Sequence, residues 1–223
     1  MRTKAFTKEI RRSITRSMSR FWAIFIIVAL GAGFYASLRS IAPDMRLTID
    51  HYFDEQHVMD LHGISTMGFT DGDIEALESL EEIDQVMPAY TVDVNSKIDQ
   101  KDTVIRVHSL AEDFQDEDSM NRPILTDGRW PEKGGECVIS TNTMYSTEEL
   151  LGKTITVTNP DQDLNEVLNH TEFQVVGIVE SPYYISFSLG SSDIGSGTLD
   201  QFMYVLSDDF NQPAYTEIFM TVN

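Results

Sequence analysis

The feature that most constrains this chain is a run of eighteen residues without a charge, between Arg20 and Arg39. As an α-helix this run is about 27 Å long, slightly less than the hydrocarbon core of a bilayer, which is about 30 Å thick. The flanking arginines can extend toward the headgroups and close the difference. Aromatic residues lie near both ends of the run, as is usual at a membrane interface. The run therefore predicts a transmembrane helix over residues 21–38.

A cleaved signal peptide is the alternative interpretation of the same run. The apolar core of a signal peptide usually has only ~7–15 residues, but it ends at small residues that permit cleavage. Gly31, Ala32 and Gly33 supply such small residues here. The sequence alone leaves this alternative open.

Charge is distributed very unevenly along the chain. Residues 1–20 carry seven Lys and Arg against one acid, a net charge of +6, whereas residues 21–223 carry nine bases against thirty-five acids, a net charge of −26. Because basic flanks stay inside, we expect a cytoplasmic N-terminus and an extracytoplasmic chain from about residue 40 onward. Nucleic acid is not an expected partner, since its phosphates would repel the large acidic part. Cationic ligands, such as antimicrobial peptides, should be attracted to it.

The first twenty residues have helical periodicity. Apolar residues recur every four positions from Phe6 to Met18, and basic residues recur every four positions with an offset of two. Two positions are ~200° around a helix, so the basic stripe lies opposite the apolar one. The pattern predicts an amphipathic helix over residues 1–20 on the inner membrane surface. A disordered basic flank is the alternative, because short helices fray. The basic positions are Lys4, Lys8, Arg12, Arg16 and Arg20.

Small residues recur at four-residue spacing within the apolar run, at Ala29, Gly33 and Ser37. This spacing produces a flat strip on one side of the predicted transmembrane helix. Such strips allow another helix to approach closely in lipid. We therefore expect this strip to pack against another membrane helix.

The outer part of the chain has the pattern of an α+β domain. Pro43 is well placed in the first turn of a new helix, so residues 39–56 are expected to form a stalk that leads into a domain over residues 57–223. Thr70 followed by an acid at Asp73 predicts the start of a further helix. A short helix is also expected at residues 147–151, and a turn-rich, hairpin-like loop at residues 127–135. Alternation of apolar residues predicts strands at residues 57–69, 86–94, 103–108, 136–140, 154–158, 173–179, 202–206 and 218–222.

No motif in the sequence indicates catalysis, a cofactor or a metal. Cys137 is the only cysteine, and the five histidines lack the spacing of a zinc site. The glycine-rich residues 190–197 lack the Lys-Ser/Thr pair of a phosphate-binding loop. The acidic residues 112–118 lack the ligand spacing of a calcium loop and are interpreted as a solvated loop. We therefore expect a protein that is not an enzyme.

Five segments resemble the beginning of an FtsX-like, MacB-type ABC transporter permease. They are FWAIFIIVALGAGFYASLRSIAPDM, GFTDGDIEAL, ILTDGRWPEKGGECVIS, FQVVGIVESPYYIS and GSSDIGSGTLDQFMYV. The resemblance implies one span followed by an extracytoplasmic domain of the MacB periplasmic core type, and then three further spans. We therefore expect this chain to be the N-terminal portion of a longer permease in the cell membrane.

The resemblance also implies partners and a mode of action. The partners would be a cytoplasmic ABC ATPase and a second permease copy, and the strip at Ala29, Gly33 and Ser37 would meet another span. ATP hydrolysis would drive movement of the outer domain, for export of a peptide, lipoprotein or antibiotic or for mechanical signalling. The alternative function is a membrane-anchored or secreted acidic binding module without a transport role.

Overall fold

The computed structural model describes residues 6–10, 12, 18–98, 100–140, 150–186 and 188–223. The chain forms two units, Met1–Tyr52 and Phe53–Asn223.

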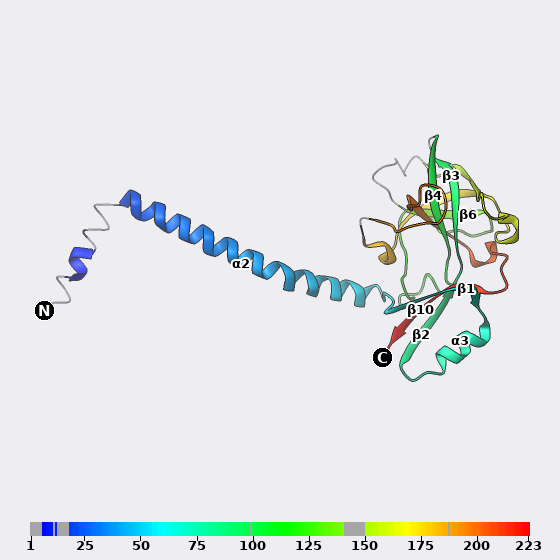
Figure 1. Cartoon of the computed structure of the whole chain (residues 1–223), viewed down its shortest axis with the longest axis horizontal. Helices are drawn as coiled ribbons and strands as arrows, with labels where there is room; N and C mark the ends of the chain where they lie inside the picture. The colour runs from blue at the N-terminus through cyan, green and yellow to red at the C-terminus, as the bar shows by residue number, and fades with distance from the viewer. Residues whose placement is uncertain (1–5, 11, 13–17, 99, 141–149, 187) are drawn as a thin grey trace. The chain divides into compact units, whose positions relative to one another are not determined.

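The first unit consists mainly of helix α2 (Met18–Glu55), drawn in blue and cyan in Figure 1. Its side chains from Met18 to Asp50 are all exposed, and it is long and apolar enough to cross a membrane. Residues 6–10 and 12 are also helical. The helix start that we expected at Pro43 is not observed, because Pro43 lies inside α2. A proline removes one backbone hydrogen bond, and α2 continues on both sides of it.

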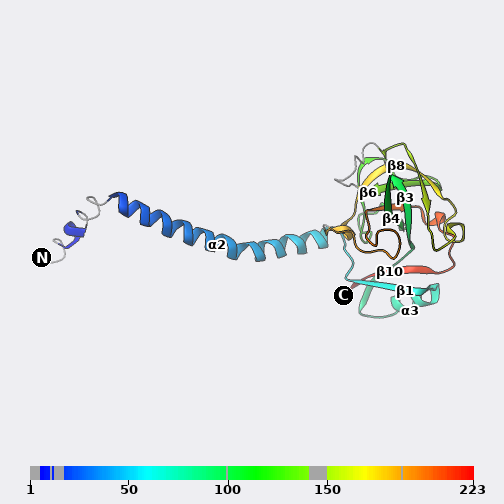
Figure 2. The same cartoon turned by 45° about the horizontal axis from the view of Figure 1, so that its top comes forward.

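The second unit is built around a seven-stranded sheet. Its strand order is β5-β8-β6-β9-β4-β3-β7, and β7 also pairs with β8. The strands from β8 to β7 therefore close into a ring, and β5 extends it at β8; Figure 2 shows part of this ring. The strands are β3 (Thr91–Ile98), β4 (Lys101–Ser109), β5 (Ile124–Gly128), β6 (Glu136–Ser140), β7 (Thr154–Thr158), β8 (Glu172–Glu180) and β9 (Gln201–Val205).

The main core consists of alternate residues of these strands. Val94, Ile105, Ile139, Phe173 and Met203 belong to one cluster, and each is fully buried. Alternation places every second side chain on the same face of a strand, so this cluster fills the ring. Strands β6 and β9 are buried along their whole length, because a second cluster packs against their other face.

A three-stranded sheet lies beside the ring in the same unit, with the order β1-β10-β2. Its strands are β1 (Leu61–Phe69), β2 (Ile83–Ala89) and β10 (Tyr215–Val222). Helix α3 (Asp71–Glu78) buries Ile74 against Ile218 and Met220 of this sheet. Short 3-10 helices occur at η2 (Leu164–Glu166), η3 (Pro182–Tyr184) and η4 (Ser207–Asp209).

The α+β fold class is confirmed, and most predicted strands are present. The predicted strand 86–94 is wrong as one element, because β2 ends at Ala89, β3 begins at Thr91, and the two belong to different sheets. The predicted strand 57–69 begins only at Leu61. The loop 127–135 is not a hairpin, since β8 lies between β5 and β6. The helix expected at residues 147–151 falls largely outside the described residues, which resume at Leu150.

The start of α3 agrees with the predicted cap. The backbone N–H and the hydroxyl of Thr70 both donate to Asp73 Oδ2, at 2.8 Å each. These bonds hold the pKa of Asp73 below its usual value. A carboxylate in the first helical turn also interacts favourably with the helix dipole.

Candidate functional site

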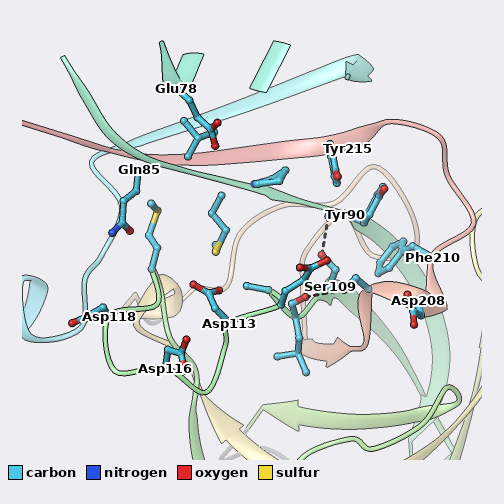
Figure 3. A pocket seen from close by; sticks show the side chains of 18 of the residues that line it. Glu78, Gln85, Tyr90, Ser109, Asp113, Asp116, Asp118, Asp208, Phe210 and Tyr215 are labelled. Carbon is cyan, nitrogen blue, oxygen red and sulfur yellow. Dashed lines mark hydrogen bonds between the residues drawn. The ribbon is translucent and has the colours of Figure 1, made fainter. Parts of the chain in front are cut away.

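An open groove of about 1310 Å³ lies in the second unit. Its walls come from β2, from the segment 109–120 that follows β4, from the chain around η4 and from the start of β10. Figure 3 shows that the labelled acids Asp113, Asp116 and Asp118 lie on one side of the view. Tyr90, Phe210 and Tyr215 lie on the other side.

The groove is strongly acidic. Eight carboxylates line it, and no lysine or arginine is among the described residues of its lining. Five of the eight belong to one short segment between β4 and β5, and the other three come from distant parts of the chain. The groove is therefore suited to a cation. The eight residues are Glu78, Asp84, Glu112, Asp113, Asp116, Glu117, Asp118 and Asp208.

The opposite wall of the groove is aromatic. The ring of Tyr90 stacks on Phe210 with the centroids 5.2 Å apart, and its centroid lies 4.9 Å from that of Tyr215. Ser109 fixes the backbone here, because its Oγ accepts a 2.9 Å hydrogen bond from the Tyr90 N–H. Burial raises the pKa of the Tyr90 phenol, with smaller contributions from Tyr215 and Asp71. Neutral aromatic faces near carboxylates are favourable surfaces for ammonium and guanidinium groups.

A small recess of about 30 Å³ shares part of its wall with the groove. The remaining lining is largely apolar and includes Phe114, Tyr183 and Phe219. Its volume is enough for at least one water molecule. The six residues that line both cavities are Met87, Pro88, Ser109, Leu110, Ala111 and Met120.

Asn121 lines this recess and forms hydrogen bonds to the chain that follows α2. Its backbone N–H donates to the His57 carbonyl at 3.0 Å, and its Oδ1 accepts from the Met59 N–H at 3.1 Å. Asn121 has a left-handed backbone, with φ of 51°, which asparagine tolerates better than most residues. Only 6% of its surface is exposed, and its Nδ2 has no hydrogen-bond partner. Asp118 adds a contact to His57, with Oδ1 3.8 Å from Nε2.

A buried polar cluster lies between the two sheets. His108 of β4 has Nδ1 2.8 Å from Thr91 Oγ1 and Nε2 2.6 Å from the Tyr184 hydroxyl. Glu217 of β10 has Oε2 3.3 Å from His62 Nε2 of β1. Burial lowers the pKa of His108 to about 4. Burial alone would raise the pKa of Glu217, but the nearby His62, His108 and Thr91 outweigh it and the net pKa is lowered.

These groups do not form a catalytic constellation. Cys137 is fully buried, and burial raises the pKa of its thiol, so the reactive thiolate is disfavoured. Among the described residues, no set of three or more His, Cys, Asp or Glu side chains could hold a metal ion.

The residues predicted from sequence lie in the first unit. Ala29, Gly33 and Ser37 are exposed on α2, and a Cβ atom added at Gly33 would meet nothing within 4 Å. Of the basic positions, Lys8, Arg12 and Arg20 are exposed and helical. Lys4 and Arg16 lie outside the described residues.

The groove was missed by the sequence analysis, which interpreted residues 112–118 only as a solvated loop. The signal available was the density of acids in that loop. The acidic loop becomes one wall of a groove only together with Tyr90, Phe210 and Tyr215, which are close to the loop only in the folded chain.

One helix that is long and apolar enough to cross a membrane, followed by an α+β domain, fits a membrane protein with an extracytoplasmic domain. The sequence profile of the family described as MacB-like periplasmic core domain matches residues 21–223. The chain therefore belongs to this family. It carries the extracytoplasmic domain of a MacB/FtsX-like ABC transporter permease.

Solved structures were also compared with this chain. The extracellular domain of the ABC-type transporter YknZ from Gram-positive bacteria is 16% identical over 71% of this chain and 75% of its own, with a TM-score of 0.44. The periplasmic region of MacB from Actinobacillus actinomycetemcomitans is 14% identical over 70% of this chain and 65% of its own, with a TM-score of 0.38. A domain assigned to a permease protein from Porphyromonas gingivalis is 14% identical over 72% of this chain and 69% of its own, with a TM-score of 0.37. Comparison with curated proteins gave no match.

Proposed function

We propose that this chain supplies the first span and the outer domain of an FtsX-like ABC transporter permease subunit. In this function a cytoplasmic partner ATPase hydrolyses ATP and drives movement of the outer domain. The movement serves the export of a peptide, lipoprotein or antibiotic, or a mechanical signal across the membrane. The observation that carries the proposal is one membrane-length helix, α2, directly followed by a domain of the MacB-like periplasmic core family.

The chain just after α2 supports the coupling part of the proposal. The Val58 N–H donates to the Phe53 carbonyl at 3.0 Å, and Asn121 bonds both His57 and Met59. Asn121 follows directly on the acidic segment that lines the groove. A displacement of residues 57–59 would therefore be transmitted to that segment through two short hydrogen bonds.

The proposed partners follow from the membrane segment. The positively charged N-terminus is proposed to lie in the cytoplasm, with Lys4, Lys8, Arg12, Arg16 and Arg20 on the inner lipid surface. The strip at Ala29, Gly33 and Ser37 is proposed to pack against another span of the assembly, which contains a second permease copy. A binding module without a transport role is the second candidate, and the acidic groove is the observation that favours it.

Gly33→Leu should weaken the assembly of the permease with its ATPase. The leucine fills the flat strip and prevents close approach of another helix. The measurement is the amount of ABC ATPase that co-purifies with the tagged full-length permease from native membranes in mild detergent. We expect a severalfold reduction.

Gly31→Leu is the matched control, because Gly31 lies ~200° around the helix from Gly33 and a Cβ atom there also meets nothing within 4 Å. This variant should retain normal co-purification. Equal yields from both variants would remove the packing strip from the proposal. If no ATPase co-purifies with the unchanged protein or with either variant, the result would favour the binding module without a transport role.

A further inference from the structure

The groove presents two kinds of surface that favour different parts of one ligand. Eight carboxylates line it, and five of them belong to residues 112–118, where Asp116 and Glu117 are exposed to solvent. Its other side carries the ring of Tyr90, which stacks on Phe210 and lies tilted against Tyr215. A ligand with several ammonium or guanidinium groups would gain from both, by charge attraction and by cation–π contact.

The recess supplies an independent observation that points to a ligand. The Asn121 Nδ2 is a buried donor without a partner, and a buried donor of this kind is unfavourable until an acceptor satisfies it. Asn121 lines the recess, whose wall is shared with the groove. The acceptor would come from a ligand that lies in the groove and carries a carbonyl oxygen.

The recess also favours a small apolar group. Its lining includes Ala89, Leu110 and Phe114. Met87 and Met120 line both the recess and the groove, and methionine side chains adapt readily to the shape of a bound group. In a peptide, the backbone carbonyl beside a short apolar side chain supplies the hydrogen-bond acceptor that Asn121 Nδ2 lacks.

We propose that the groove binds an extended cationic peptide. Its basic side chains lie along residues 112–118 and against the aromatic wall, and one small apolar side chain enters the recess. A carbonyl beside that side chain accepts a hydrogen bond from Asn121 Nδ2. The inference rests on the proposed function for its biological role, in which this peptide is the exported or sensed substrate.

The first test compares peptides on the unchanged full chain in a neutral maltoside detergent. The probe is a fluorescein-labelled decapeptide of alternating Lys and Val, with decalysine and an alternating Gln and Val decapeptide as references. At physiological salt, fluorescence anisotropy should show the Lys and Val peptide binding roughly tenfold more tightly than decalysine, which is the effect expected for burying one Val side chain. It should also bind more tightly than the Gln and Val peptide, which has the same apolar side chains but no positive charge. Decalysine that binds equally well would overturn the proposal, because charge alone would then explain binding.

The second test locates the site with variants of equal charge change. Asp116→Asn with Glu117→Gln should weaken binding of the Lys and Val peptide by roughly fivefold, because two exposed ion pairs are lost. Asp161→Asn with Glu166→Gln changes the same charge at exposed positions outside the groove, and should leave binding within about twofold of the unchanged chain. Equal losses in both variants would contradict a groove site.

The third test addresses Asn121. Asn121→Asp keeps the acceptor for the Met59 N–H but removes the Nδ2 donor and adds a negative charge. The charge favours both cationic peptides, so the variant should lower the affinity for the Lys and Val peptide relative to that for decalysine. Thermal unfolding of this variant shows whether the fold is retained, and the peptide comparison above stands without it. An unchanged ratio of the two affinities in a folded variant would contradict the carbonyl contact.

These results are separable from those on the ATPase. Peptide binding in the groove without any co-purifying ATPase would support this inference and contradict the proposed function. A co-purifying ATPase together with equal binding of all three peptides would support the proposed function and contradict the peptide site.

Discussion

Lowering the pH from 7 to 4 is expected to destabilise the outer domain by about 3 kcal/mol through His108 alone. The folded chain holds the pKa of His108 at about 4, because burial disfavours the charged ring. An unfolded histidine has a pKa of about 6.5. Between these values the unfolded chain binds a proton that the folded chain does not, so the free energy of unfolding falls as the pH falls. Above pH 6.5 this effect is absent.

The groups around His108 determine the rest of this pH dependence. Glu217 and Asp93 favour its charged form, whereas Arg106 and His62 oppose it. Its ring nitrogens lie within hydrogen-bond distance of the Thr91 and Tyr184 hydroxyls. The pKa of Glu217 is lowered in the folded chain. Its carboxylate therefore stabilises the fold above the unfolded pKa, and this stability is lost as the pH falls through the folded pKa. Both groups therefore make the domain less stable in acid.

Urea unfolding of the full chain at pH 7, 5.5 and 4.5 measures this effect, with His108→Gln as the comparison. Glutamine has donors and acceptors to replace the two hydrogen bonds but does not titrate. The variant should lose stability at pH 7 and show a shallower decline toward pH 4.5. An unchanged decline in the variant would show that other groups cause the acid sensitivity.

Gly177→Ala is expected to destabilise the outer domain by about 3 kcal/mol, because the methyl group has no room. A Cβ atom at Gly177 would lie 2.5 Å from the Arg129 carbonyl oxygen and 2.9 Å from Leu125 Cδ1. The first of these is backbone and cannot rotate away. Gly177 is also the register partner of Gly128, so the chain of β5 approaches β8 closely at this point.

Gly72→Ala is the matched control for this prediction. Gly72 lies in α3, and the nearest atom to an added Cβ is Thr70 Oγ1 at 3.8 Å. Alanine is favoured over glycine within a helix by roughly 0.5–1 kcal/mol, so this variant should be slightly more stable. Thermal unfolding of both variants provides the measurement. A Gly177→Ala variant as stable as the unchanged chain would show that β5 can move away from β8.

The sequence allowed prediction of elements whose signals are local. Strands β6 and β7 have the predicted bounds, and Thr70 and Asp73 indicated the start of α3. The division at Tyr90 was not predictable in this way. Residues 86–94 are strand-like throughout, and no local signal marks a break at Tyr90. Their division depends on which strands pair with each half: β10 pairs with β2, whereas β4 and β7 pair with β3.

Strand β5 and the groove were missed for related reasons. Strand β5 is short, lies at the edge of the ring and has no buried residue, so it lacks a clear apolar alternation. The groove combines Glu78, Asp84 and Asp208 with acids from the loop 112–118. These segments are distant in the sequence, and only the pairing of β10 with β2 and the course of the chain after β9 bring them together.

The most direct test of the central claim is the accessibility of single cysteines to a membrane-impermeant maleimide in intact cells. The native Cys137 is buried and should give little background, so Lys8→Cys and Asp161→Cys can be compared in the full-length permease. We expect labelling of Asp161→Cys in intact cells and labelling of Lys8→Cys only after permeabilisation. Labelling of Lys8→Cys in intact cells, or a mature chain that begins near Phe34 and is free of membranes, would contradict the claim.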